Sequence, residues 1–266
     1  MIKLGVNSVL FGGYDFATAC KHIKAAGYDG IEISAIAGMC EHLNLAKWMH
    51  EKTEIKQIVS DNGLEILSSE VASLDEERLR PAFEAAQAIG IPVINVGPGG
   101  QSDDENDLQA SMEKLEAMSD LADEYGVTLC VKAHVGSAIF NTPTTLRAMD
   151  HIQSRAFGID MDPSHIYRAG EDPAQALKQV VSRVKHIHIR DCKGPGPSPG
   201  TPPDQACGRG DIDLHAYCKV LEDSGYNGPV CLEVIGANEM ELPAVSIIAA
   251  ESYGYLNATL KSLSAR

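Results

Sequence analysis

Ionisable side chains stand at the ends of apolar runs in the C-terminal half of the sequence. "GIDMDPSH" places Asp162 and His165 three residues apart where an apolar run stops, and "KHIHIRD" and "CLEVIG" bring His188 and Glu233 to similar places. A charged group in an apolar strand is costly unless it is paired or binds a metal. Two carboxylates and an imidazole suit Mn²⁺, Mg²⁺ or Zn²⁺. The pattern therefore predicts a divalent metal site formed by Asp162, His188 and Glu233.

Structural explanations compete with this prediction. Asp162 could simply cap the turn that follows it, because Asp-Pro-Ser is ordinary turn chemistry, and His165 taken alone is as readily a core or surface histidine. A functional role is favoured for Glu233, since burying an unpaired carboxylate in the apolar run "CLEVIG" would cost free energy. Arg190 and Asp191 could be no more than an ion pair at the rim of the fold.

Other ionisable residues stand at comparable places. "VTLCVKAH" ends with Lys132 and His134, whose side chains share one face of their strand because side chains alternate along it. The same alternation aligns His186 with His188, and His186 is expected to lie deeper and to be structural. Further candidates for lining the same site are Glu32, Glu70 and Asn95.

Strand-like and helix-like segments alternate along the whole chain. Short β-branched or apolar runs are each followed by a longer segment of helical period and often by a glycine. The expected strands lie at residues 2–7, 30–34, 64–69, 92–97, 127–134, 156–162, 184–191 and 229–236. Eight such units predict a (β/α)8 barrel, in which the C-terminal strand ends converge on one mouth. An open doubly wound sheet is the alternative, but the first turn, "NSVLFGGYD", lacks the GxGxxG phosphate loop of that fold.

The composition is that of an acidic globular protein. The 266 residues are 44% hydrophobic and carry a formal net charge of −15. This charge opposes binding to nucleic acid or to an anionic membrane, so a small-molecule partner is expected. The start of the chain shows no cationic leader, no run of about 18 apolar residues occurs, and the seven cysteines form no CxxC pair. These features are typical of a cytoplasmic protein with reduced thiols.

One long segment is rich in proline and glycine. Residues 194–210, "GPGPSPGTPPDQACGRG", cannot form a regular helix or strand over most of their length. Only one further strand and helix follow this segment. Residues 1–266 are therefore expected to form a single barrel domain, with residues 194–210 as a loop over the active site.

Together these motifs resemble the sugar phosphate isomerase/epimerase superfamily, the xylose isomerase-like TIM barrels. The resemblance covers the whole chain and rests on the order and spacing of "GYDGIEIS", "GVTLCVKAH", "DMDPSH", "HIHIRD", "GRGDID" and "LEVIG". It implies a TIM barrel whose divalent metal is held by a Glu, an Asp, a His and a Glu from the last four strands. The matching positions are Lys132, Asp162, His188 and Glu233, and the resemblance further implies that His165 touches the substrate.

Lys132 departs from that pattern, because a protonated lysine can neither bind a metal ion nor replace one of the two acid/base carboxylates of an epimerase. Three interpretations remain open. In the first, Asp162, His188 and Glu233 bind the metal with His134 or water as a fourth ligand. In the second, Lys132 replaces the charge of the metal. In the third, the site has lost catalysis.

The resemblance implies an isomerase or epimerase that acts on a keto-sugar or related polyol carbonyl through an enediolate, with metal assistance. The alternatives are a lyase, either a dehydratase or a decarboxylase, on an oxo-sugar, and a non-catalytic sugar-binding subunit. In a catalyst, the metal or Lys132 would stabilise the oxyanion while Glu233, His165 or His134 moves the proton. The expected substrate contacts are His134, His165, Arg190 and Arg209. The net charge opposes a nuclease, and the resemblance is compatible with a homo-oligomer.

Overall fold

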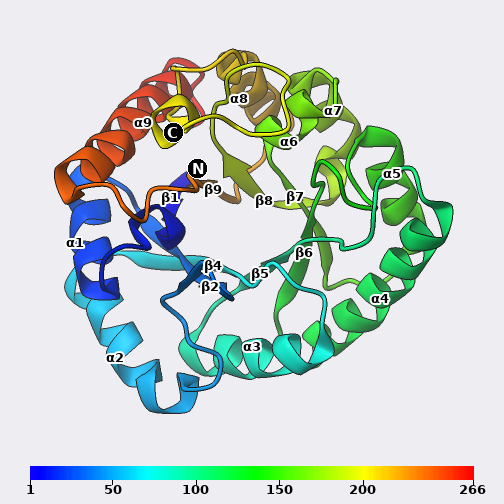
Figure 1. Ribbon diagram of the computed structural model, residues 1–266, viewed down its shortest axis with the longest axis horizontal. Helices are drawn as coiled ribbons and strands as arrows, with labels where there is room; N and C mark the ends of the chain where they lie inside the picture. The colour runs from blue at the N-terminus through cyan, green and yellow to red at the C-terminus, as the bar shows by residue number, and fades with distance from the viewer.

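Eight parallel strands close into a barrel in the computed structural model, which describes residues 1–266 (Figure 1). The strands pair in the order β1, β9, β8, β7, β6, β5, β4, β2, and β2 pairs with β1 to complete the ring. Their bounds are β1 Lys3–Asn7, β2 Gly30–Ile36, β4 Glu65–Glu70, β5 Val93–Val96, β6 Thr128–Lys132, β7 Phe157–Met161, β8 Val184–Ile189 and β9 Pro229–Leu232. The predicted (β/α)8 barrel is confirmed, and the doubly wound sheet is excluded.

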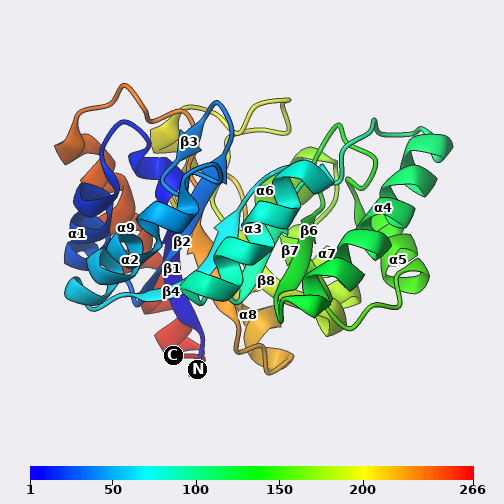
Figure 2. The same ribbon diagram turned by 90° about the horizontal axis from the view of Figure 1, so that it is seen from below.

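A ring of helices covers the outside of the barrel (Figures 1 and 2). They are α1 Phe16–Ala26, α2 Trp48–Asp61, α3 Glu76–Ile89, α4 Glu105–Glu124, α5 Thr142–His151, α6 Pro163–Arg168, α7 Pro173–Val180, α8 Leu214–Asp223 and α9 Leu242–Ser262. In α1 the side chains of Ala19, Cys20 and Ile23 recur at helical spacing and are fully buried. Asp15 caps this helix by accepting a hydrogen bond from Thr18 N. None of the helices combines the length and hydropathy needed to cross a membrane.

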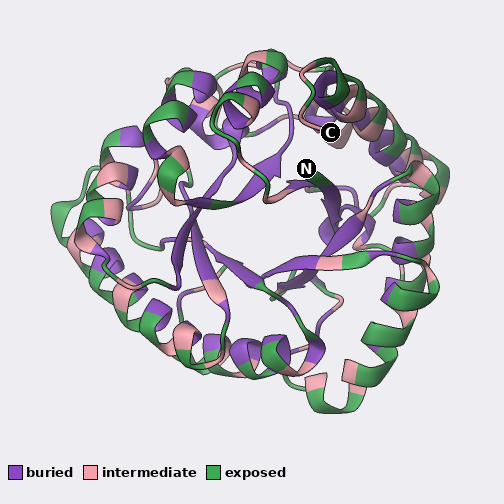
Figure 3. Ribbon diagram, turned by 180° about the vertical axis from the view of Figure 1, so that it is seen from behind, coloured by how far each residue is buried: buried purple, intermediate pink, exposed green.

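The strands are buried on both faces, which explains why their sequences read as nearly continuous apolar runs (Figure 3). Outward side chains pack beneath the helices, and inward side chains fill the barrel. Near the C-terminal ends of the strands the buried side chains become polar. They include Asn7 on β1, Glu32 on β2, Glu70 on β4, Asn95 on β5 and Lys132 on β6. The fold therefore gathers polar groups from distant parts of the chain at one end of the barrel.

Departures from the predicted pattern lie at the C-terminal ends of the strands, where the expected strands at residues 127–134, 184–191 and 229–236 stop early, at Lys132, Ile189 and Leu232. A two-residue strand, β3 Cys40–Glu41, pairs antiparallel with the end of β2. The expected strand at residues 156–162 ends one residue early, because Asp162 is the N-cap of α6 and accepts a hydrogen bond from Ser164 N at 2.8 Å. The capping role considered for Asp162 is thus present, and this tight turn brings α6 directly over the end of β7.

The segment 194–210 forms a loop at the edge of the barrel opposite the two chain termini (Figure 2, yellow). It contains a short 3-10 helix, Pro202–Gln205. The carboxylate of Asp191 accepts hydrogen bonds from the backbone N–H groups of Cys192, Gly208 and Ile212 at 3.0, 3.0 and 3.1 Å. One side chain therefore joins the two ends of the loop.

This anchoring changes the interpretation of two motifs. Asp191 is engaged by backbone N–H groups, so the ion pair with Arg190 that the sequence allowed does not form. In "GRGDID", Gly210 packs so closely on Asp191 that an added Cβ would lie 2.1 Å from Oδ1. The motif is explained by the loop anchor, since no larger residue fits beside this carboxylate.

Candidate active site

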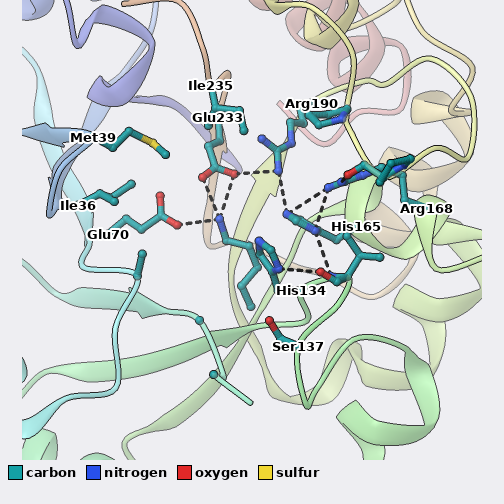
Figure 4. A pocket seen from close by; sticks show the side chains of 17 residues that line it. Ile36, Met39, Glu70, His134, Ser137, His165, Arg168, Arg190, Glu233 and Ile235 are labelled. Carbon is teal, nitrogen blue, oxygen red and sulfur yellow. Dashed lines mark hydrogen bonds and ion pairs between the residues drawn. The ribbon is translucent and has the colours of Figure 1, made fainter. Parts of the chain in front are cut away.

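A cavity of about 470 Å³ opens at the C-terminal mouth of the barrel (Figure 4). Ile36, Met39 and Ile235 give it an apolar side. Its ionisable lining residues are Glu70, Lys132, His134, His165, Arg168, Arg190 and Glu233. Strand ends that are far apart in sequence thus supply one pocket, which is where barrels of this kind place their chemistry.

The ammonium group of Lys132, which lines this cavity, lies between the carboxyl groups of Glu70 and Glu233. Nζ is 2.7 Å from Glu70 Oε1 and 2.9 and 3.0 Å from the two oxygens of Glu233. All three side chains are buried, with 3–4% of their surface exposed. Asn7 donates a further hydrogen bond to Glu70 Oε2 at 2.6 Å. A buried charge is tolerated when it is paired and hydrogen-bonded in this way.

The two carboxyl groups differ in how readily they lose a proton. Burial, followed by the charge of Glu233, raises the pKa of Glu70 to about 8. Burial would also raise the pKa of Glu233, but the charges of Lys132 and Arg190 outweigh it and hold this pKa well below its ordinary value. Near neutral pH the site therefore contains one protonated and one ionised carboxyl group, an arrangement that separates an acid from a base.

Arg190 connects this cluster to α6. Its Nε donates to Ser164 Oγ at 2.8 Å, and its Nη2 lies 2.8 Å from His165 Nε2, 2.9 Å from Asp162 Oδ2 and 3.5 Å from Glu233 Oε2. Only 2% of Arg190 is exposed, yet its Nη1 has no hydrogen-bond partner. A buried guanidinium nitrogen without a partner, on a residue that lines the cavity, is suited to a ligand oxygen.

His165 lies at the wall of the cavity beside His134, with the ring centroids 4.1 Å apart. Arg168 Nη2 is 2.9 Å from His165 Nδ1, and Arg190 Nη2 is 2.8 Å from Nε2. Burial, followed by the charge of Arg190, holds the pKa of His165 well below its ordinary value. His165 is therefore a neutral imidazole between two guanidinium groups.

His188 belongs to a deeper layer and does not line the cavity. Its Nδ1 is 2.5 Å from Asp160 Oδ2 and its Nε2 is 2.6 Å from Glu32 Oε2, while Glu70 Oε2 is 3.9 Å away. Burial opposes protonation, but Asp160 and Glu32 raise the pKa of His188 well above its ordinary value. His186 Nδ1 lies 3.0 Å from Asp160 Oδ1, within the barrel, as the expected structural role requires.

Other side chains of the protein therefore contact the three residues that were predicted to bind a metal. Asp162 and Glu233 meet through Arg190, and Lys132 occupies the face of Glu233 that looks toward Glu70. His188 lies below the cavity with a carboxylate close to each ring nitrogen, hydrogen-bonded at Nε2 and without hydrogen-bond geometry at Nδ1. This arrangement does not fit a divalent ion shared by Asp162, His188 and Glu233.

Other groups of potential ligand atoms lie deeper in the barrel. Three sets have their ligand atoms within 4.8 Å of one another: Glu32 with Glu70 and His188, Asp160 with His186 and His188, and Glu32 with His186 and Cys231. Every member is buried and the sets share members. Candidate ligands for a metal are thus present; His188 Nε2 is hydrogen-bonded to Glu32 and His186 Nδ1 to Asp160, whereas His188 Nδ1 and Asp160 Oδ2 have no partner in hydrogen-bond geometry.

Among the predicted substrate contacts, the structure places His134, His165 and Arg190 in the cavity and Arg209 outside it. Arg209 forms a bidentate ion pair with Glu251 on α9, and the side chain is 41% exposed. In the structure this carboxylate on the outer helix holds the guanidinium away from the mouth.

Three residues of the site were missed or undervalued from the sequence. Glu70 was only a candidate lining residue, Asp160 was not singled out, and Arg168 was not considered. Asp160 carried a usable signal, since it is a carboxylate within the apolar run "FGIDM". Arg168 lies one helical turn after His165, the last residue of the Asp-Pro-Ser-His motif. Nothing in the sequence indicates that Arg168 faces the cavity.

An ionisable cluster at the C-terminal mouth of a (β/α)8 barrel is the arrangement used by TIM-barrel enzymes. The chain belongs to the xylose isomerase-like TIM barrel family, whose sequence profile matches residues 20–253. The resemblance inferred from the motifs is therefore confirmed.

Relatives in this family include an inosose dehydratase from Clostridium perfringens, 28% identical over 165 residues. That match covers 56% of this chain and 54% of the relative, so the chain spans about half of its length. A D-psicose 3-epimerase from Clostridium cellulolyticum, solved with D-tagatose, has a TM-score of 0.77 at 16% identity over 97% of this chain and 99% of its own. The IOLI protein, solved with a zinc atom, has a TM-score of 0.76 at 19% identity over 98% of both chains. At these identities the two structures establish the fold.

Proposed function

We propose that this protein is an enzyme that removes the proton next to the carbonyl group of a sugar or sugar-derived polyol. The observation that carries the proposal is the position of Lys132 between Glu70 and Glu233 in an open cavity. The reaction needs a base for the C–H proton and a cation for the oxygen that gains charge. Glu233 supplies the base and Lys132 supplies the cation. Glu70 adds a second carboxyl group, which carries a proton.

The ammonium group has one N–H left for the substrate. One N–H bonds to Glu70. The two oxygens of Glu233 subtend a much smaller angle at Nζ than the tetrahedral angle between N–H bonds, so they share a second. The third N–H has no partner on the protein, and Lys132 lines the cavity. A carbonyl oxygen bound there would accept it.

Proton transfer then proceeds without a change in the charge around Lys132. Glu233 takes the proton from the carbon, and the electron pair of the C–H bond moves to the carbonyl oxygen, forming an enediolate. The negative charge thereby passes from Glu233 to the substrate oxygen. Lys132 and Arg190 neutralise it in both states, which is the preorganised stabilisation that accelerates such steps.

Isomerisation and loss of water are the two outcomes open to this intermediate. Return of the proton to the former carbonyl carbon, with transfer of the adjacent hydroxyl proton to the oxyanion, gives an isomer. Alternatively, the enediolate re-forms the carbonyl while the hydroxyl on the next carbon leaves with the proton of Glu70 as water. The difference in pKa between Glu70 and Glu233 favours this second, dehydratase reaction, and the names of the inosose dehydratase relatives agree with it.

Substrate hydroxyl groups would be held on the opposite wall. The free Nη1 of Arg190 donates to a substrate oxygen, and Nε2 of His134, whose Nδ1 pairs with Val135 O, contacts a further hydroxyl group. Both ring nitrogens of His165 face arginines, so this residue positions Arg168 and Arg190 at the wall. Ile36 and Met39 cover the apolar side of the ligand (Figure 4). A compact, oxygen-rich molecule matches this distribution better than an extended apolar one.

Incubation of the protein with keto-sugars and cyclic polyol ketones in deuterated water tests the proposal. Nuclear magnetic resonance should show deuterium beside the carbonyl group, with an isomer or a dehydrated product accumulating. The Glu233→Gln variant, which keeps the shape of the side chain but not its basicity, should show neither. Saturable binding of these compounds without any exchange would instead identify a non-catalytic sugar-binding subunit.

A further inference from the structure

The contacts of Lys132 bear on what supplies positive charge at this site. Its Nζ has three carboxylate oxygens within 3.0 Å, contributed by β4 and by the residue that follows β9. The surroundings are those of a small bound cation, with oxygen ligands from two sides and almost no solvent access. Here the cation is part of the chain.

A divalent ion and this ammonium group would compete for the same oxygens. An ion on Glu70 and Glu233 would lie within a few ångströms of Nζ, and like charges repel strongly at that distance in a buried site. Asp162 does not provide an alternative ligand for the ion, because Arg190 Nη2 lies 2.9 Å from its Oδ2 and Ser164 N donates to its Oδ1. Two fixed cations thus occupy the carboxylates at the mouth.

The deeper donors are similarly engaged. His188 faces Asp160 through one nitrogen and Glu32 through the other. Asn95 donates to the second oxygen of Glu32 at 2.6 Å. An ion in this layer would have to displace the hydrogen bonds of Glu32 to His188 and Asn95. It would also gain no open coordination position toward the cavity, since His188 and Glu32 do not line it.

We propose that the ammonium group of Lys132 takes the place of a divalent metal in this barrel, so that the site binds and polarises its substrate without an ion. The catalytic half of this statement rests on the proposed function. The statement that the site needs no metal does not rest on the proposed function, and it is tested separately by measuring bound metal. Its chemical consequence is that Lys132 is a catalytic residue, since its third N–H contacts the substrate oxygen that gains charge.

The test begins with protein purified without chelator, incubated with Zn²⁺ or Mn²⁺ and then dialysed. Elemental analysis of the wild type should find less than about a tenth of an ion per chain, and neither ion should shift the unfolding temperature. Lys132→Glu should acquire close to one ion per chain and unfold at a higher temperature when the ion is present. Lys114→Glu is the matched control, because it makes the same charge change at an exposed lysine and should acquire none.

The Lys132→Glu variant brings three acidic side chains together, at positions 70, 132 and 233, and this repulsion can prevent folding. Lys132→Gln avoids the repulsion and keeps the test decisive. It removes the positive charge at similar size, so Zn²⁺ or Mn²⁺ should stabilise this variant but not the wild type. A stoichiometric ion in dialysed wild-type protein, or equal stabilisation of the wild type and Lys132→Gln, would overturn the inference. A metal-free wild type that exchanges no substrate proton would instead overturn the proposed function, and a metal-bearing wild type that does exchange it would overturn only the role of Lys132.

Discussion

The carboxyl groups of Glu70 and Glu233 come from strands that do not pair with each other, yet both reach the one ammonium group of Lys132. Strands β1 and β2 lie between β4 and β9 in the ring. Closure of the barrel is therefore what creates the cluster, and the two acids approach Lys132 from different sides. This geometry gives the surrounding residues separate tasks.

Replacing Glu233 with Gln should lower turnover by about 100- to 10,000-fold, the range typical of a lost general base. The substrate should still bind, because Gln retains the size of the side chain and one acceptor oxygen. Steady-state kinetics on a substrate found by deuterium exchange would measure the effect. Glu239→Gln, an exposed residue in the loop after β9, should leave the rate unchanged. Similar rates for Glu233→Gln and the wild type would remove Glu233 from the mechanism.

Activity should fall as the pH rises through about 8. Burial and Glu233 raise the pKa of Glu70 to about 8, so Glu70 carries its proton below this pH and loses it above. If that proton leaves with the hydroxyl group, the dehydration rate should decline by about tenfold per pH unit on the alkaline side. In Glu70→Gln the rate should be low and this decline absent. An unchanged alkaline limb in Glu70→Gln would assign the pH dependence to another group.

Arg168→Ala should loosen the loop that contains residues 194–210. Arg168 Nη1 donates to Pro197 O at 2.9 Å, and Pro197 and Pro199 line the cavity. Limited proteolysis within the loop should become faster, and KM should rise by roughly tenfold, as for the loss of one hydrogen bond from a charged group. Arg155→Ala, which removes a guanidinium that is 84% exposed, is the control. Equal cleavage rates in both variants would show that Arg168 does not fasten the loop.

Asp160→Asn should destabilise the fold more than it alters substrate binding. Its two oxygens lie 3.0 Å from His186 Nδ1 and 2.5 Å from His188 Nδ1, and the charge of Asp160 balances the protonated ring of His188. Leaving that buried charge uncompensated should lower the free energy of unfolding by about 3–5 kcal/mol, measured by urea denaturation. The exposed pair of Asp123 with Arg155 provides the control, and Asp123→Asn should cost less than about 1 kcal/mol. Comparable losses in the two variants would contradict the role given to Asp160.

The barrel could be predicted from the sequence because each strand and helix carries its own periodic signal. Glu233 was visible for the same reason, since a carboxylate in an apolar strand end is unusual. Asp162 shows where local evidence stops being sufficient. The sequence left open whether Asp162 caps a turn or serves the site; in the structure one carboxylate oxygen caps α6 and the other lies 2.9 Å from Arg190 Nη2, a contact that was not predicted.

The partners of the site residues could not be predicted, because they are set by closure of the ring and by side-chain direction. Lys132 and Glu70 are 62 positions apart, and no local pattern relates them. His188 was expected at the mouth, but Asp160 and Glu32 draw both of its nitrogens into the barrel. The position of Arg209 was likewise not predictable, since its partner Glu251 lies on an outer helix whose orientation the sequence does not reveal.

Asp191 gives the loop over the cavity a property that matters for engineering. Because one carboxylate holds the backbone at Cys192, Gly208 and Ile212, the two ends of the loop stay together whatever the chain does between them. The intervening residues could therefore be lengthened, shortened or exchanged for those of a related barrel without moving the strands that carry the charged cluster. We therefore expect changes within the loop to alter which molecules enter the cavity while the charged cluster keeps its geometry.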